Sequence, residues 1–457
     1  NVSADPRNYR HDRLRHGICV PTKCTTVANI NANITSQEMP IRKKVETCYN
    51  EKFKSLELKG KVSDVVCNTI ESKYIVDKYD IIIGWLLSFH FFCILEQRKN
   101  ISIKYMALAF VNRYIRLTPA LAVMLAIEST WIVHMGKGPQ WDALVAEEYR
   151  NCKENWWTNI LYINNYVGKK TMCLHQTWYI AADTQLFIFG MILLMIMSRF
   201  HHGKIKTVFA ITVILGILIQ GSIAFVENYD IVVRQYPEAL YNMNVLKSDI
   251  WHDLYSSGHS NITGYMIGLW AGYLFYKYKD TQLCINKVYV TLWWILTFGL
   301  CIFVVLIAGI MYKPNYKYTR MESALYWALG KNLFALGIAI GIFGFTQRVG
   351  WFARRICEWK AVQVLGRLTY STYIIHVTLI RIRAGLTRYP LFINDYLMAS
   401  TALGDILLSY LGGTILCLMV EMPVSALQKM MLPPQSTTNK TDVPSEKPLK
   451  KQKRIWQ

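Results

Sequence analysis

Long apolar runs alternate with short polar segments from Asp80 to about residue 420, and the chain before Asp80 is polar and charged. A run of about 20 apolar residues is long enough to cross the hydrocarbon core of a bilayer as a helix. By the length of unbroken apolar sequence we predict nine spans, at 80–95, 117–133, 178–198, 206–226, 262–276, 288–312, 324–345, 366–380 and 397–420. Runs of this length argue against a lipid-facing β-barrel, whose strands have about 10 alternating residues.

This pattern predicts a mostly α-helical protein that crosses the membrane many times, in about nine spans. We expect three parts along the chain. Residues 1–79 form a small N-terminal module, residues 80–428 form the membrane domain, and residues 429–457 form a basic tail. The tail is rich in Lys, Pro, Ser and Thr, a composition typical of disordered segments.

The N-terminal module carries four cysteines in a polar stretch, Cys19, Cys24, Cys48 and Cys67. Four cysteines allow three pairings, and the sequence does not choose among them. Asn33 begins a glycosylation sequon, which suits an oxidising lumen. Metal binding is disfavoured because His11 and His16 lie outside ligand spacing. We therefore predict a helical, disulfide-stapled, exported module without a metal.

The formal net charge is +21, which by itself would suggest a nucleic-acid partner. The basic residues flank apolar runs, however, and that placement is typical of cytosolic loops and of contact with anionic membrane lipid. The bias of Lys and Arg predicts residues 1–79 in the lumen or outside the cell, the C-terminus in the cytosol, and no nucleic acid. The loop with Arg381, Arg383 and Arg388 breaks this rule.

Cysteine usage agrees with that orientation. Cys152 and Cys173 fall in a loop predicted to be outside, so they complete a set of six disulfide candidates. The remaining cysteines lie in spans or on the cytosolic side, where free thiols are expected. The chain starts at Asn1 without Met or an apolar targeting segment, which predicts a removed export signal or a fragment.

Charged residues inside or beside the spans are the candidates for chemistry. Asp183 lies in span 178–198, where an acid costs about 2.5–3.5 kcal/mol and therefore marks function or a hydrated helix end. Arg113 and Arg116 are three residues apart at a membrane boundary and share a helical face. Guanidinium groups hold phosphates bidentately, so the pair could bind an acyl-CoA, or it could anchor the helix at lipid headgroups.

Two histidines in apolar surroundings are candidate bases. His376 lies in span 366–380 and is either a base or a hydrogen-bonded interior residue. His90 is the histidine of the first span. Neither has metal-ligand spacing, and the sequence contains no phosphate-binding loop and no Gly-x-Ser-x-Gly elbow.

Several motifs resemble, in order, those of the nose-resistant-to-fluoxetine type within membrane acyltransferase family 3. The Arg113-Tyr-Ile-Arg116-Leu-Thr-Pro-Ala stretch is similar to the family's arginine motif. The most specific match is the Asn- and Trp-rich stretch 155–166 followed by Thr177-Trp-Tyr and then Asp183-x-Gln185. Other matches are Gly17-Ile-Cys-Val-Pro21, the stretch from Leu365 to His376, and Glu421-Met-Pro423.

The resemblance implies an integral-membrane acyltransferase of the endoplasmic reticulum or plasma membrane. A cytosolic acyl-CoA would dock on Arg113 and Arg116 as co-substrate, without a further cofactor. Asp183 and His376 would shape the catalytic cavity, and the acyl group would pass to a hydroxyl of a lipid or small-molecule acceptor.

The sequence departs from the family in its first helix. The family's Leu-Asp-Gly-Leu-Arg motif and the histidine base after it have no counterpart here. Asp77 and His90 have a similar separation, which we interpret as coincidence, so His90 stays only a candidate. Ser260-Asn261 stands where the family has Thr-Arg. A non-catalytic carrier or transporter of lipids or small molecules is therefore the alternative function, and a receptor-like binding protein is a third.

Overall fold

The computed structural model describes residues 78–98, 103–199, 202–231, 248–278, 286–311, 318–347, 349–388 and 394–431. The N-terminal module with Cys19, Cys24, Cys48, Cys67 and the Asn33 sequon, and nearly all of the tail, lie outside these residues. Every regular element in the described part is a helix, as the apolar pattern predicts. The longer helices are α4 (Lys78–Arg98), α5 (Ile103–Ala126), α6 (Glu147–Ile160), α7 (Trp178–Ser198), α8 (His202–Val226), α10 (Gly258–Lys277), α11 (Lys287–Met311), α12 (Arg320–Thr346), α14 (Lys360–Leu386), α15 (Asp395–Leu416) and α16 (Met422–Met431), and α13 (Trp351–Cys357) is short.

Every predicted span coincides with a helix, but the helices differ in how apolar they are. Six stretches are long and apolar enough to cross a membrane: Ile103–His134, His175–Ser198, Lys204–Val226, Lys287–Ile310, Arg320–Thr346 and Asp395–Gln428. α4 contributes a shorter apolar stretch. α10 and α14 match the predicted spans 262–276 and 366–380 and are less apolar. The chain is a polytopic α-helical membrane protein.

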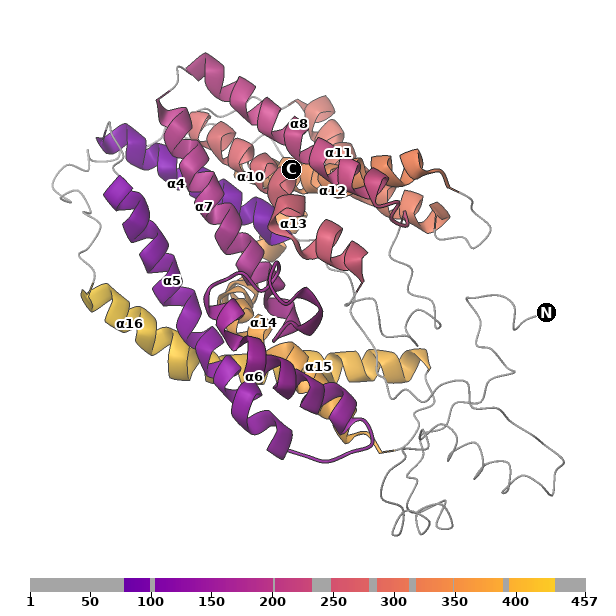
Figure 1. Cartoon of the computed structure of the whole chain (residues 1–457). Coiled ribbons are helices and arrows are strands. Elements are labelled where there is room, and N and C mark those ends of the chain that lie inside the picture. The colour runs from indigo at the N-terminus through magenta and orange to yellow at the C-terminus, as the bar shows by residue number, and fades with distance from the viewer. Residues whose placement is uncertain are drawn as a thin grey trace, which may run out of the picture.

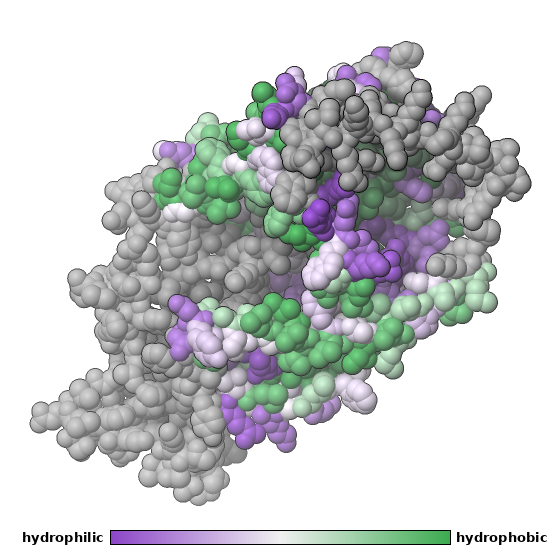
Figure 2. Space-filling model, turned by 180° about the vertical axis from the view of Figure 1, so that it is seen from behind, coloured by the Kyte–Doolittle hydropathy of each residue, from purple (hydrophilic) through white to green (hydrophobic). Residues whose placement is uncertain are grey.

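The helices form two groups (Figure 1). In one group α10 packs against α4, α7, α8 and α12, and α11 packs against α12. In the other group α14 packs against α15, and α5 packs against α6, α14 and α16. We call these the α10 half and the α14 half. Figure 2 shows the opposite face, where hydrophilic residues gather in a recess between apolar surfaces.

Small residues allow the closest helix contact, between α4 and α10. A Cβ added at Gly84 would lie 2.6 Å from the backbone oxygen of Tyr265, and one at Gly268 would lie 2.3 Å from the backbone oxygen of Ile81. Small side chains let two backbones approach in this way, and such contacts hold membrane helices together where burial from water does not. These glycines therefore fix the position of α4 on α10.

Local sequence sets several helix ends. Thr319 and Glu322 form a capping box at the start of α12, and the Asn394 side chain accepts a hydrogen bond from the Leu397 amide at the start of α15. Four π-helical turns interrupt the regular geometry, at Ile127–Trp131, Asp142–Ala146, Trp251–Ser256 and Cys417–Glu421. Such turns occur frequently at functional sites. Each of them carries a buried or hydrogen-bonded acid: Glu128, Asp142, Asp253 and Glu421.

Candidate functional site

An ion pair between Arg113 of α5 and Asp183 of α7 connects the two halves. The side chain of Asp183 is 5% exposed and that of Arg113 is 22% exposed. The Arg113 guanidinium also lies over the Phe187 ring, 4.8 Å from its centroid. Burying an isolated charge among membrane helices costs free energy, and each of these two groups neutralises the charge of the other. The acid of span 178–198 is thus at an internal contact and not at a hydrated helix end.

Hydroxyl groups surround this ion pair from the α14 half. Tyr162 and Thr118 share a hydrogen bond of 3.0 Å, and the Tyr370 hydroxyl donates to the backbone carbonyl of Leu117. Burial raises the pKa of Tyr162 to about 12, so this phenol is neutral at physiological pH. The neighbourhood of Arg113 and Asp183 therefore combines charge with hydroxyl donors.

A second acid lies close by at the end of α15. Ser371, which is fully buried, donates a 2.7 Å hydrogen bond to Glu421 in the π-helical turn Cys417–Glu421. From the sequence, Glu421 could be a helix-end interface acid, and it begins the Glu421-Met-Pro423 motif. Its signal was visible as an acid at the end of an apolar run, but only the packing of α14 on α15 shows that Ser371 holds it.

The structure separates Arg113 from Arg116. Arg113 turns toward Asp183, whereas Arg116 is exposed on the surface of α5. His376 is half-buried on α14, and its Nδ1 lies 2.7 Å from the backbone oxygen of Tyr373. His90 is on the exposed side of α4. Of the predicted site residues, the structure joins Arg113 and Asp183 in direct contact.

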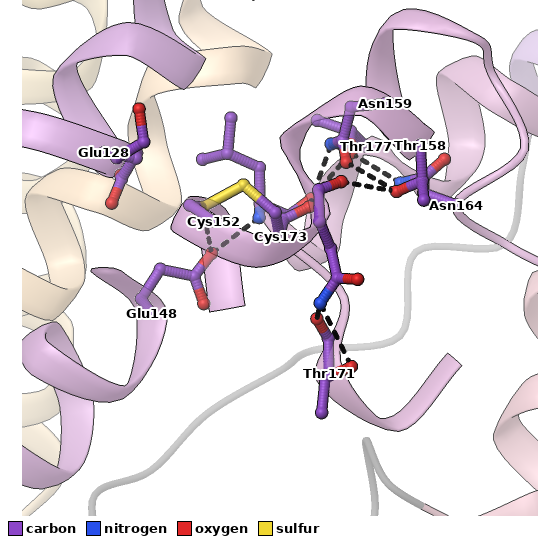
Figure 3. The surroundings of a disulfide bond; sticks show 12 residues. Glu128, Glu148, Cys152, Thr158, Asn159, Asn164, Thr171, Cys173 and Thr177 are labelled. Atoms are coloured by element: carbon purple, nitrogen blue, oxygen red, sulfur yellow. Dashed lines mark hydrogen bonds between the residues drawn. A yellow bond between two sulfur atoms is a disulfide. The ribbon is translucent and has the colours of Figure 1, made fainter. Parts of the chain in front are cut away.

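The Asn- and Trp-rich stretch forms the support beneath α7. The Asn159 amide donates to the Cys173 carbonyl at 2.9 Å and to the Thr177 hydroxyl at 2.7 Å, and Asn164 donates to the same hydroxyl at 2.9 Å. Figure 3 shows this Asn–Thr network beside the disulfide. Because Thr177 immediately precedes α7, these bonds fix the start of the helix that carries Asp183.

Two residues at the ends of this loop have strained backbones. Tyr162 has φ 55° and Leu174 has φ 47°, in the left-handed region that residues other than glycine rarely adopt. Such strain costs about 1–3 kcal/mol and persists only where the surroundings fix it. Here Gln185 donates to the Tyr162 carbonyl at 2.9 Å, and the Leu174 amide donates to Glu148 at 2.6 Å. The loop is thus held to α6 and α7 by polar side chains.

Cys152 and Cys173 are joined by a disulfide that closes the loop between α6 and α7. Glu148 lies next to it, with Oε1 3.8 Å from Cys152 Sγ (Figure 3). Among the described residues, Glu148, Cys152 and Cys173 are the one group of His, Cys, Asp and Glu close enough to share a metal ion. Both sulfurs are bonded to each other in the disulfide, so this group acts as a covalent cross-link between the two ends of the loop.

Another polar contact lies in the α10 half. The Asn261 amide oxygen accepts a hydrogen bond from Lys331 of α12. Lys331 also lies 5.3 Å from the ring centroid of Tyr255. A cationic group of a different helix therefore reaches Asn261.

Comparison with known proteins identifies the family. Residues 81–422 match the model of the acyltransferase domain family, acyltransferase 3. The chain is 24% identical over 390 residues to nose resistant to fluoxetine protein 6 from Caenorhabditis elegans, and the alignment covers 79% of this chain and 45% of that protein. No solved structure matches the chain. The match spans both halves and includes the Arg113–Asp183 pair, which confirms the predicted resemblance: the chain belongs to membrane acyltransferase family 3.

Proposed function

We propose that this protein transfers an acyl group from a cytosolic acyl-CoA-type donor to a hydroxyl group of a lipid or small-molecule acceptor. Membership of the acyltransferase family supports the reaction class. The observation that carries the proposal is the Arg113–Asp183 ion pair, which joins the two halves, together with the exposed guanidinium of Arg116 one turn along α5.

Arg116 is the donor-binding arginine in this proposal. An exposed guanidinium on a membrane helix is costly against lipid, so it requires water or an anion next to it. The phosphates of coenzyme A supply that anion and match the planar fork of the guanidinium. Arg113 is already paired with Asp183, so it holds α5 against α7 and positions Arg116.

The transfer itself needs a base. The acceptor hydroxyl oxygen attacks the thioester carbonyl carbon, the carbon–sulfur bond breaks, and the hydroxyl proton passes through the base to the thiolate. His376 is a suitable base because its Nδ1 hydrogen can be donated to the Tyr373 carbonyl at 2.7 Å. That bond leaves Nε2 with a lone pair that can accept the proton.

The sidedness we propose places the disulfide loop in the lumen or outside, and the starts of α5 and α14 toward the cytosol. The arginines that break the charge rule do not oppose this orientation, because carboxylates neutralise two of them. Arg381 pairs with Glu148 at 2.6 Å and Arg383 pairs with Asp405 at 2.7 Å. A guanidinium that is matched by a carboxylate is a weak topology signal, because its charge is neutralised in the fold. The compartment we infer is the endoplasmic reticulum or the plasma membrane.

A truncated donor tests the role of Arg116. Purified wild-type protein and Arg116→Ala are assayed with acyl-CoA and with the same acyl group on pantetheine, which lacks the phosphates of the nucleotide. We expect Arg116→Ala to raise KM for acyl-CoA by about 10- to 100-fold, equivalent to one charge-assisted hydrogen-bonded contact. With the pantetheine donor the two proteins should be equal. Arg354→Ala, which removes an arginine from α13, is the matched control.

The outcome also decides between enzyme and carrier. If wild-type protein binds lipid but consumes no acyl-CoA in the presence of membrane lipids, the transferase proposal is wrong and the carrier alternative stands. If Arg116→Ala lowers turnover equally with both donors, Arg116 does not bind the nucleotide phosphates.

A further inference from the structure

A second buried charge cluster lies at the other end of α5. Glu128 is in the π-helical turn Ile127–Trp131 and is 0% exposed. Glu148 at the start of α6 is 4% exposed, and its carboxylate contacts Arg381 of α14 at 2.6 Å. The hydroxyl of Thr378, one turn before Arg381, donates a hydrogen bond to Glu128 Oε1. Figure 3 shows both glutamates, with Glu148 next to the disulfide.

The charges of this cluster do not balance. Two carboxylates face one guanidinium. Arg381 attracts both Glu128 and Glu148 electrostatically. An unneutralised carboxylate away from water costs several kcal/mol, so a buried site of this kind takes up a positive charge. Arg381 forms its ion pair with Glu148, so the excess negative charge lies on Glu128.

Unpartnered acceptor atoms point to the same conclusion. Oε2 of Glu128 is buried and has no hydrogen-bond partner. Nε2 of His175, the residue whose ring stacks on Trp251 with centroids 5.5 Å apart, is also buried without a partner. A protonated imidazole would place a second buried cation near Arg381, whereas a proton on Glu128 removes an excess negative charge, so His175 is neutral here. The atom that can carry the missing proton is Glu128 Oε2.

We propose that Glu128 is a proton-binding site, in which the carboxyl group holds its proton on Oε2 while Oε1 accepts from Thr378. The binding step is the formation of one O–H bond, with the proton taken from solvent at the outer end of the domain. Glu128 and Arg381 act on each other, Glu148 acts on both, and Glu147 acts on Arg381. The other charged and titratable groups nearby on the elements packed around Glu128 are His175, His134 and Asp142, then Arg150, Lys153 and Glu154 of α6, and His376 and Arg383 of α14.

Glu128 is distinct from the Arg113–Asp183 pair, because 15 helical positions separate Arg113 from Glu128, about 22 Å at 1.5 Å per residue. It lies nearer to the proposed base, since His376 is two residues before Thr378 on α14. The assignment of a proton to Glu128 does not rest on acyl transfer, and its test below measures unfolding and the carboxyl proton rather than turnover.

Two matched substitutions test the assignment by unfolding of the purified full chain. Glutamine resembles a protonated glutamate in shape and charge, so we expect Glu128→Gln to unfold at or above the wild-type temperature at neutral pH. Glu148→Gln removes the ionised partner of Arg381 and should unfold about 10 °C lower. Glu154→Gln, at an exposed position of α6, is the control and should match wild type.

The pH dependence gives a second readout. The folded protein holds a proton that the unfolded chain releases, so wild-type stability should fall as the pH rises. Glu128→Gln should lack this decline, and Glu154→Gln should keep it. In infrared spectra, the carboxylic-acid C=O band at neutral pH should be weaker in Glu128→Gln than in wild type or Glu154→Gln.

The opposite results overturn the proposal. If Glu128→Gln unfolds at as low a temperature as Glu148→Gln, Glu128 is ionised and shares Arg381. If the infrared band is unchanged in Glu128→Gln, the proton is not on this residue.

Discussion

The guanidinium of Arg113 contacts Asp183 and lies over Phe187 at the same time, so one side chain of α5 holds two successive turns of α7. The residues that pack around these two helices are otherwise mainly apolar. One cluster joins α5 to the start of α7, and the other packs the rest of α7 against α4, α8 and α10. An ion pair joins two particular side chains, so it fixes the register between the helices that carry them. The pair therefore sets the height of α5 relative to α7, and with it the position of Arg116.

Removing Asp183 should destabilise the protein strongly. Asp183→Ala leaves Arg113 buried and uncompensated, which costs about 3–5 kcal/mol. The control is Asp142→Ala, which breaks a pair with Arg150 at 3.3 Å whose side chains are 87% and 56% exposed. An exposed pair contributes about 0–1 kcal/mol. The measurement is the unfolding transition in detergent, and equal losses in the two variants would show that Asp183 is hydrated.

This prediction changes how Arg113 variants are interpreted. Sequence reasoning treated Arg113 and Arg116 as one phosphate-binding pair, so loss of activity in Arg113→Ala would have been attributed to donor binding. Because Arg113 is paired with Asp183, the same substitution removes a contact between the two halves. Activity in an Arg113 variant is informative only after its folded fraction has been measured.

The glycines between α4 and α10 provide a test of the packing. Gly268→Ala places a methyl group 2.3 Å from the backbone oxygen of Ile81, so the two helices must separate. We expect a loss of about 1–3 kcal/mol, typical of overpacking. Gly404→Ala, where nothing lies within 4 Å, should instead be neutral or gain about 0.5–1 kcal/mol from helix propensity. If both variants behave alike in thermal unfolding, α4 does not sit tightly on α10.

The elements that sequence could predict are those fixed by local pattern. The nine apolar runs can be read directly from the sequence. The importance of Asp183 follows from the free energy of placing an acid in a membrane span, because such an acid needs a partner. The split between Arg113 and Arg116 could not be predicted, because it depends on which side of α5 faces α7. Glu128 lies in the predicted span 117–133 and carries the same cost as Asp183. It went unnoticed because no motif marks it.

Breaking the disulfide should loosen the support of α7 without abolishing the fold. The cysteines are 21 residues apart, and closing a loop of that length contributes about 3 kcal/mol in the chain-entropy view. We expect Cys152→Ser and Cys173→Ser to lose similar stability and the double variant to lose no more than either. Cys357→Ser, at a free and exposed cysteine, is the control. A double variant that loses the sum of the single losses would show that the two sulfurs act separately.

The contact between Asp253 and Lys169 should make stability depend on pH in the acid range. Asp253 lies in the π-helical turn Trp251–Ser256, 2.9 Å from Lys169 Nζ and 2.8 Å from the Tyr229 hydroxyl. Partial burial by itself raises the pKa of the Asp253 carboxyl, but the hydrogen bonds from Lys169 and Tyr229 outweigh it, and the net pKa is lowered.

A carboxyl with a lowered pKa in the folded state stabilises the fold above its unfolded pKa of about 3.9. That contribution is lost as the pH falls through the lower, folded pKa. We therefore expect Asp253→Asn to be less stable than wild type at neutral pH and to approach it below about pH 4. The loss should be modest, because the paired side chains are about one-third exposed and water screens them. Asp249→Asn, whose pair with Lys170 is 65% exposed on both sides, should show a smaller offset. An Asp253→Asn offset that stays constant from neutral to acid pH would show that the contact does not depend on the charge of Asp253.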